Sequence, residues 1–118
     1  MTRVLVVEDD LDLRQLLVEE LLAAGHEVRA CGNVPAARWV LASFQPQLVL
    51  LDIGLPVFDG NELAEHVRNF CTTDPIVVAV TGLPESAVRR DLYDLVLEKP
   101  VEWARISEVL ASMRVVSS

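Results

Sequence analysis

The sequence is poor in cysteine and in positive charge, and it has no long apolar run. Its two cysteines, Cys31 and Cys71, lie forty positions apart without a CxxC pair, which argues against a disulfide framework or a zinc site and fits a reducing cytosol. Ten lysines and arginines stand against 18 aspartates and glutamates, and the net charge of −8 disfavours direct contact with nucleic acid. The longest apolar runs have the length of a strand, far below the roughly 18 residues that a membrane span needs.

The remaining composition is that of one globular domain. Of the 118 residues, 52% are hydrophobic and 24% are charged, which suffices for a buried core and leaves no disordered tract. The chain passes from Thr2-Arg3 straight into an apolar stretch and then into acidic residues, so we expect no signal peptide. We therefore expect a single cytoplasmic domain over residues 1–118, without a membrane partner.

Five short apolar runs alternate with segments in which apolar residues recur at helical spacing. The expected strands cover residues 4–7, 27–30, 48–51, 76–80 and 95–97, and the expected helices fall within residues 11–24, 34–41, 61–70, 84–92 and 103–113. The third strand is an unbroken apolar run, Leu48 to Leu51, as is typical of a strand buried on both faces. This alternation predicts a parallel sheet covered on both sides, that is, a three-layer, doubly wound α/β fold.

Local signals mark the ends of the first two helices. Asp9 or Asp10 is expected to cap the first helix, and Gly25 to end it. Asn33 is expected to cap the second helix. Phe70 is expected on the buried face of its helix, and Trp39 and Trp103 are expected to pack within the domain, with a partner-facing position as the alternative for either tryptophan.

Polar residues follow four of the five expected strands. Glu8 and Asp9 follow the first strand, Asp52 the third, Thr81 the fourth and Lys99 the fifth. The carboxyl ends of parallel strands share one edge of the sheet, where ligands bind in such folds. Three carboxylates there repel one another unless a cation with oxygen ligands, such as Mg²⁺, compensates them. A lysine and a hydroxyl suit a bound phosphoryl group, and a carboxylate can itself be the nucleophile that forms an aspartyl phosphate.

Four motifs, in this order and at the ends of these strands, resemble the receiver domain of two-component response regulators. They are Val6-Val7-Glu8-Asp9-Asp10, Leu51-Asp52-Ile53-Gly54-Leu55-Pro56 with Asp59-Gly60, Val80-Thr81-Gly82, and Lys99-Pro100. The resemblance covers essentially the whole chain, and it implies a flavodoxin-like sheet of strand order 2-1-3-4-5 with five helices. It also implies a stand-alone receiver or one cut from a larger regulator or hybrid kinase.

The resemblance assigns roles to the acidic residues. Asp52 would accept the phosphoryl group. Glu8 and Asp9 would be the acidic pair that holds Mg²⁺, with the Asp52 carboxylate and the Gly54 backbone carbonyl as the other protein ligands. The donor would be a phosphohistidine of a sensor histidine kinase or a histidine phosphotransfer protein. The domain would act as a switch or phosphorelay carrier, catalysing only its own phosphorylation and dephosphorylation.

The resemblance also assigns roles to the residues after the last two strands. Thr81 would hydrogen-bond the phosphoryl group and shift on phosphorylation, and Lys99 would pair with the phosphoryl oxygens. The Lys99-Pro100 peptide bond would be cis, as is usual in the family, although a cis X-Pro bond is a minority state elsewhere.

Several positions depart from the family pattern. Eighteen positions separate Thr81 from Lys99, fewer than is usual, so we expect the helix of residues 84–92 to be short or partly irregular. Val96 stands where many receivers carry an aromatic residue that rotates with the threonine, and Tyr93 is an alternative that the sequence does not place. Gly54 and Leu83 stand where polar side chains in related receivers help to orient hydrolytic water. We therefore expect the acyl phosphate to hydrolyse slowly.

Three other classes of protein are alternatives to a phosphorylated receiver. A haloacid-dehalogenase-type phosphatase would need a second aspartate where Gly54 stands and a cap insertion that the chain lacks. A flavin-binding protein of the same topology would need a phosphate loop after the first strand, where Glu8-Asp9-Asp10 would repel the phosphate. A phosphate-independent docking module, or pseudo-receiver, is opposed by the complete set of site residues, yet the shortened segment before Lys99 leaves it open.

Overall fold

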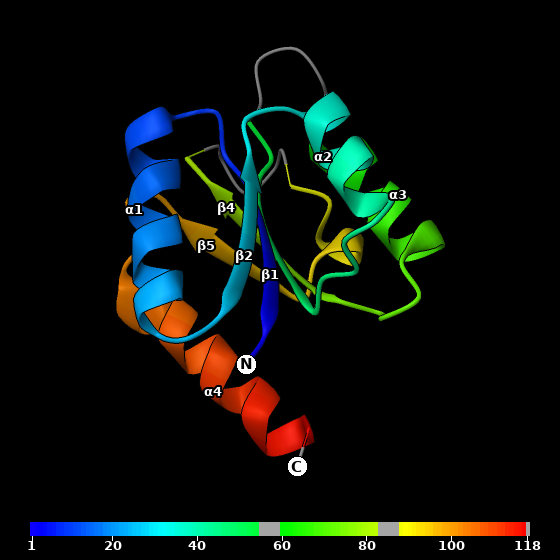
Figure 1. Ribbon diagram of the computed structural model, residues 1–118. Helices are drawn as coiled ribbons and strands as arrows, with labels where there is room; N and C mark the ends of the chain where they lie inside the picture. The colour runs from blue at the N-terminus through cyan, green and yellow to red at the C-terminus, as the bar shows by residue number, and fades with distance from the viewer. Residues whose placement is uncertain (55–59, 83–87, 118) are drawn as a thin grey trace.

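The computed structural model describes residues 1–54, 60–82 and 88–117, and it contains the predicted parallel sheet (Figure 1). The sheet has the order β2-β1-β3-β4-β5, which confirms the predicted 2-1-3-4-5 arrangement. Its strands are β1 (Arg3–Val7), β2 (Glu27–Cys31), β3 (Leu48–Asp52), β4 (Ile76–Thr81) and β5 (Leu95–Glu98). Every neighbouring pair is parallel, so all five carboxyl ends lie at one edge.

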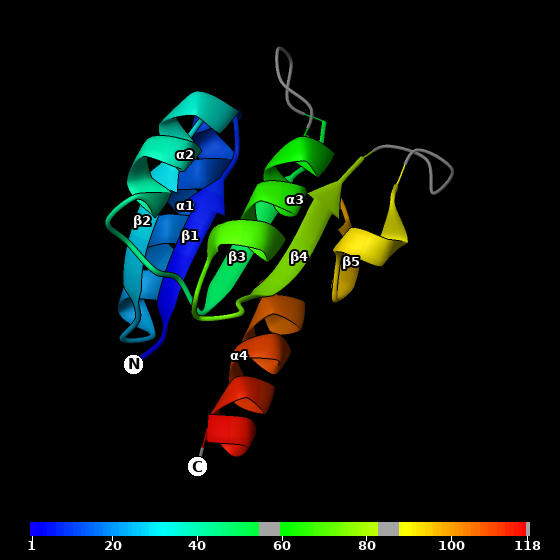
Figure 2. The ribbon, with the colours of Figure 1, turned by 90° about the vertical axis from the view of Figure 1, so that its right-hand side faces the viewer.

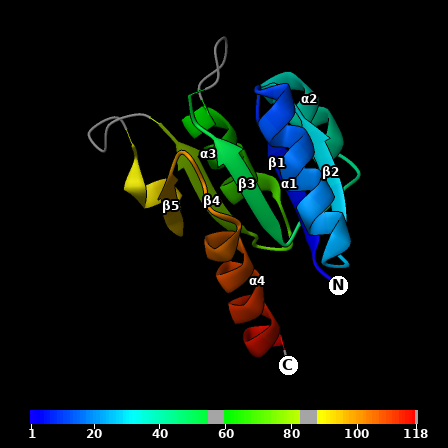
Figure 3. The same ribbon diagram turned by 90° about the vertical axis from the view of Figure 1, so that its left-hand side faces the viewer.

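Helices cover both faces of the sheet, as Figures 2 and 3 show from opposite sides. The α-helices of the described residues are α1 (Leu11–Ala23), α2 (Val34–Leu41), α3 (Gly60–Phe70) and α4 (Trp103–Ser117). Asp10 caps α1, because its side chain accepts hydrogen bonds from the amides of Asp12 and Leu13. Asn33 caps α2 by accepting from the Ala36 amide, and Gly25 follows α1 with a φ of +88°. These capping predictions are confirmed.

Two apolar clusters form the core, one on each side of the sheet. The first joins one face of the strands to α2 and α3 through buried residues such as Leu51, Leu63 and Val67. The second joins the opposite face to α1 and α4 through residues such as Leu21 and Ile106. All five residues of β3 are buried, since this central strand is covered on both sides. The predicted three-layer architecture is therefore confirmed.

The segment before β5 was predicted to hold the fourth helix over residues 84–92, in a short or partly irregular form. Residues 84–87 lie outside the described part of the chain, and residues 88–92 contain a 3₁₀ helix at Arg90–Leu92 in place of α-helix. Tyr93 and Asp94 then lead directly into β5. Arg68 of α3 binds this short connection, because its guanidinium donates to the Leu92 carbonyl at 3.0 Å and to Asp94 Oδ2 at 2.9 Å. The connection is therefore held by Arg68 together with backbone hydrogen bonds, in which the Leu92 amide donates to the Arg89 carbonyl and the Asp94 amide to the Val77 carbonyl.

Two of the three aromatic packing predictions are wrong. The Trp39 side chain is 81% exposed and that of Phe70 68% exposed, because each projects from the outer side of its helix. Phe70 instead lies against the His66 ring, with 4.8 Å between ring centroids. Trp103 is half-buried against the second core cluster, as predicted. Cys31 and Cys71 are both free thiols, which agrees with the predicted absence of a disulfide framework.

Among the described residues, no helix combines the length and the apolar character that crossing a membrane requires.

Candidate functional site

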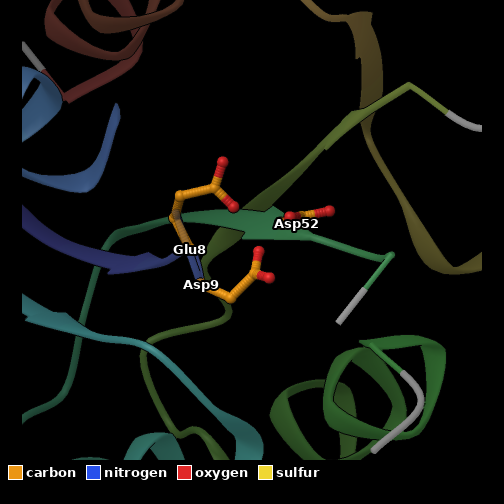
Figure 4. A group of neighbouring side chains, drawn as sticks. All are labelled: Glu8, Asp9 and Asp52. Carbon is orange, nitrogen blue, oxygen red and sulfur yellow. The ribbon is translucent and has the colours of Figure 1, made fainter. Parts of the chain in front are cut away.

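The carboxyl edge of the sheet brings the predicted acidic residues together. Glu8 directly follows β1, and Asp52 is the last residue of β3, its neighbour in the sheet. Carboxylate oxygens of Glu8, Asp9 and Asp52 all lie within 4.8 Å of one another. Figure 4 shows the three side chains around one common space. The side chains of Glu8 and Asp52 are nearly buried, at 2% and 5% exposure, whereas Asp9 is exposed.

Lys99, which follows β5, reaches across this edge to two of the carboxylates. Its ammonium nitrogen Nζ lies 2.6 Å from Glu8 Oε1 and 3.0 Å from Asp52 Oδ2. The Lys99 amide also donates to the Thr81 carbonyl at 2.9 Å, which fixes its backbone at the end of β4. The Lys99-Pro100 peptide bond is cis, as predicted.

Asp52 is held at both carboxylate oxygens. Its Oδ1 accepts a hydrogen bond from the Gly54 amide at 2.8 Å, and its Oδ2 accepts one from Lys99. Thr81, the last residue of β4, is 1% exposed and lies on the strand next to β3. Gly54 is exposed at the start of the loop after β3, and Leu83 lies outside the described residues.

The pKa values of Glu8 and Asp52 are shifted in opposite directions. Burial, followed by the neighbouring Asp52 carboxylate, raises the pKa of Glu8 to about 8. Burial alone would also raise the pKa of Asp52, but the neighbouring Glu8 and hydrogen bonds from the Gly54 amide and Lys99 together lower it. Burial opposes the charge of Lys99, yet its hydrogen bonds to Glu8 and Asp52 raise its pKa. At neutral pH and without a metal, Glu8 therefore carries the proton while Asp52 stays ionised.

The donor set fits a hard divalent cation. Three carboxylates in one small volume match the oxygen ligands of Mg²⁺, which keeps several waters in such sites. Glu8 Oε2 is buried and has no hydrogen-bond partner among the described residues, so one ligand atom is left unsatisfied. The chemistry and geometry of these residues therefore suit Mg²⁺, in agreement with the prediction from the sequence.

Two residues that contact the site were not predicted as parts of it. Arg14 of α1 donates from Nη1 to the Glu8 carbonyl at 2.9 Å, and no pattern in the sequence indicates this contact. Gly60, read from the sequence as a turn residue, begins α3 against the backbone of Asp52. A Cβ added at Gly60 would lie 2.6 Å from the Ile53 Cα.

The structure shows where the Tyr93 side chain lies, which could not be predicted from the sequence. Its side chain is 8% exposed within the first core cluster, and its hydroxyl donates to Asn61 Oδ1 in the first turn of α3. Val96, at the position of the family's aromatic residue, is half-buried against the same cluster. Tyr93 therefore contacts the start of α3 rather than occupying the place of Val96.

The sequence of the chain matches a known family over most of its length. Residues 4–111 match the profile of the Response regulator receiver domain family. The chain belongs to this receiver domain family. The identification predicted from the sequence motifs is confirmed.

Curated relatives of this receiver domain are longer proteins. The response regulator protein FleR of Pseudomonas aeruginosa is 34% identical over 113 residues, which cover 92% of this chain and 24% of that protein. The virulence transcriptional regulatory protein PhoP of Salmonella typhimurium is 37% identical over 78 residues, covering 66% of this chain and 35% of that protein. The receiver domain thus spans about a quarter to a third of the length of these relatives.

Solved structures agree with the fold. The response regulator protein TrrA from Thermotoga maritima, in complex with Mg²⁺-BeF, superposes with a TM-score of 0.83 at 29% identity, covering 95% of this chain and 98% of TrrA. A second structure, the histidine kinase ThkA in complex with TrrA, gives a TM-score of 0.81 at 28% identity, covering 95% of this chain and 97% of the matched chain.

Proposed function

We propose that this receiver domain accepts a phosphoryl group on Asp52 from a phosphohistidine, with Mg²⁺ bound by the acidic cluster. The observation that carries the proposal is the environment of Asp52, an ionised carboxylate fixed by the Gly54 amide and the Lys99 ammonium. The complex of ThkA with TrrA supports a histidine kinase as the partner. The Mg²⁺-BeF complex of TrrA supports Mg²⁺ as the cofactor.

In the proposed transfer, a carboxylate oxygen of Asp52 attacks phosphorus in line with the leaving imidazole nitrogen. The new O–P bond forms as the P–N bond breaks, and the imidazole nitrogen leaves with the electron pair. The lowered pKa of Asp52 keeps the nucleophile ionised at neutral pH. Lys99 lies within hydrogen-bond distance of Asp52, where its charge would stabilise the transferred phosphoryl oxygens.

Glu8 and Asp9 would hold Mg²⁺ together with Asp52, and the Gly54 carbonyl is the fourth proposed protein ligand. When bound, the ion supplies positive charge to the phosphoryl oxygens. Glu8 must first lose the proton that its raised pKa retains. The Thr81 hydroxyl is proposed to hydrogen-bond the phosphoryl group from the end of β4.

The proposal extends to the role of the domain in the cell. We propose a cytoplasmic signalling switch or phosphorelay carrier that acts on no substrate besides itself and its phosphohistidine donor. The net charge of −8 supports an output through protein contacts rather than through nucleic acid bound by this domain.

The test is intact-mass spectrometry after incubation with Mg²⁺ and acetyl phosphate, followed by incubation with a phosphorylated histidine kinase. We expect one phosphoryl adduct in the wild type and none in Asp52→Asn or in a sample with chelated metal. An adduct of equal yield in Asp52→Asn would contradict the assignment of the acceptor. No adduct from either donor, together with no measurable Mg²⁺ binding, would instead favour a phosphate-independent docking module.

A further inference from the structure

Both backbone polar groups of Glu8 are held by other elements. Its amide donates to the Cys31 carbonyl at the end of β2, at 3.0 Å. Its carbonyl accepts from Arg14 Nη1 of α1, at 2.9 Å. That carbonyl belongs to the peptide group that joins Glu8 to Asp9. The hydrogen bond from Arg14 therefore fixes the plane of the peptide from which both acidic side chains of the pair project.

The guanidinium of Arg14 occupies a space that depends on Gly32. A Cβ built on Gly32 would lie 2.4 Å from Arg14 Nη1 and 3.7 Å from the Glu8 carbonyl oxygen. Gly32 lies between β2 and α2, and its φ is not in the left-handed region. An alanine there is compatible with the backbone and conflicts only with the guanidinium. The absence of a side chain at residue 32 is what lets Arg14 reach Glu8.

We propose that Arg14 is a positioning residue, which orients the Glu8–Asp9 peptide so that the two carboxylates converge with Asp52 on Mg²⁺. The inference rests on the proposed function of the acidic cluster. Arg14 contacts neither the cation nor the phosphoryl group in this proposal, and it acts only through the backbone of Glu8.

The charge of Arg14 and its hydrogen bond to Glu8 predict opposite changes in Mg²⁺ affinity when the side chain is replaced. A guanidinium this close to a cation site repels Mg²⁺, so removal of its charge alone would tighten Mg²⁺ binding. Loss of positioning would weaken binding, because partners that orient metal ligands contribute about tenfold or more to metal affinity. The sign of the change in affinity therefore distinguishes the two effects.

The first experiment measures Mg²⁺ affinity by isothermal titration calorimetry on wild type, Arg14→Met and Arg14→Lys. Methionine keeps an unbranched stem without a donor, whereas lysine keeps a charged donor. We expect about tenfold weaker binding for Arg14→Met and an intermediate value for Arg14→Lys. The yield of phosphoryl adduct should recover at saturating Mg²⁺. Unchanged or tighter binding in Arg14→Met would overturn the proposal.

A second variant perturbs the same contact from the opposite side. Gly32→Ala leaves Arg14 in the sequence but fills its space, so we expect it to weaken Mg²⁺ binding to a similar extent. In the double variant with Arg14→Met, the added methyl group should cause no further loss, because the guanidinium is already gone. If the losses of Mg²⁺ affinity in the two single variants add up in the double variant, then Gly32→Ala does not act through Arg14, and the proposal is overturned.

Controls separate this inference from the proposed function. Arg38→Ala removes an exposed arginine whose partner is Glu62, and it should bind Mg²⁺ like the wild type. Urea unfolding of each variant shows whether the fold persists at the assay temperature. If wild type binds Mg²⁺ and accepts the phosphoryl group while Arg14→Met matches it, only the positioning role fails. If wild type does neither, both proposals fail together.

Discussion

At the scale of single residues, Glu8 has the most perturbed acid–base chemistry of the site. Its pKa of about 8 lies far above its ordinary value of 4.5, because burial and the neighbouring Asp52 carboxylate disfavour its charge. Lys99 opposes this shift without cancelling it. A carboxyl group that holds a proton at neutral pH without metal must release it when a cation binds.

This pKa predicts how the stability of the metal-free protein depends on pH. Between pH 4.5 and about 8, folded Glu8 keeps a proton that unfolded Glu8 has lost. The contribution of Glu8 to the free energy of unfolding is therefore complete below pH 4.5 and decreases as pH rises towards 8. We expect urea unfolding in EDTA to show a lower stability at pH 8 than at pH 5, relative to Glu8→Gln.

The Glu8→Gln control is needed because other groups also titrate in this range. Burial, followed by the charge of Arg38, lowers the pKa of His66, so its contribution changes with pH in the opposite direction. Both proteins contain His66, so the difference between them isolates Glu8. A difference that grows in favour of wild type as pH rises would contradict the assignment of the proton to Glu8.

The lifetime of the proposed acyl phosphate is also decided by single side chains. Gly54 carries no polar group that could orient water, and Leu83, which lies outside the described residues, carries none in the sequence either. We expect slow hydrolysis in intact-mass time courses, because neither residue can orient the attacking water. Loss of the adduct within seconds in the presence of Mg²⁺ would contradict this prediction.

At the scale of elements, α3 connects the site to the segment before β5. Its first residue, Gly60, packs on the backbone of Asp52 and Ile53, and the next residue, Asn61, accepts a hydrogen bond from Tyr93. Further along the helix, Arg68 donates to the Leu92 carbonyl. These contacts hold the short connection in place of a full helix.

The close approach of α3 to β3 predicts that Gly60→Ala destabilises the fold. Its Cβ would lie 2.6 Å from the Ile53 Cα and 3.0 Å from the Asp52 carbonyl oxygen, and backbone atoms cannot rotate away as a side chain can. We expect a loss of about 2 kcal/mol or more in urea unfolding, even though alanine favours helix.

The matched control for Gly60→Ala is Gly82→Ala. Among the residues that the structure describes, no heavy atom lies within 4 Å of a Cβ added at Gly82, so we expect the stability of this variant to stay within about 0.5 kcal/mol of wild type. Equal effects of the two substitutions would show that the packing of α3 on β3 does not require glycine.

At the scale of the whole molecule, the site is assembled from segments far apart in the sequence. Lys99 lies 91 positions from Glu8 and 47 from Asp52 along the chain. These residues meet because β1, β3 and β5 end at one edge of the sheet, while the start of β1 and the end of α4 lie towards the opposite edge (Figure 1). The geometry of the site therefore depends on the register of the entire sheet.

The fold class could be predicted from the sequence, and so could the strand order through the resemblance to receiver domains and the gathering of strand-end polar residues at one edge of the sheet. These features follow from local chemistry, since apolar runs, caps and strand-end polar groups are readable without tertiary contacts. Glu8, Asp9, Asp52 and Lys99 were predicted correctly as neighbours for that reason.

The packing of the elements was needed to learn which carboxyl group has a raised pKa, which aromatic residues are exposed and how the segment before β5 is held. Periodicity could not exclude Trp39 from the core, because whether a helix face is covered depends on what packs against it. Nor could periodicity reveal that the lack of a side chain at Gly32 leaves space for Arg14 to donate to the Glu8 carbonyl. Such contacts join residues from different elements, and their distances exist only once the elements have packed together.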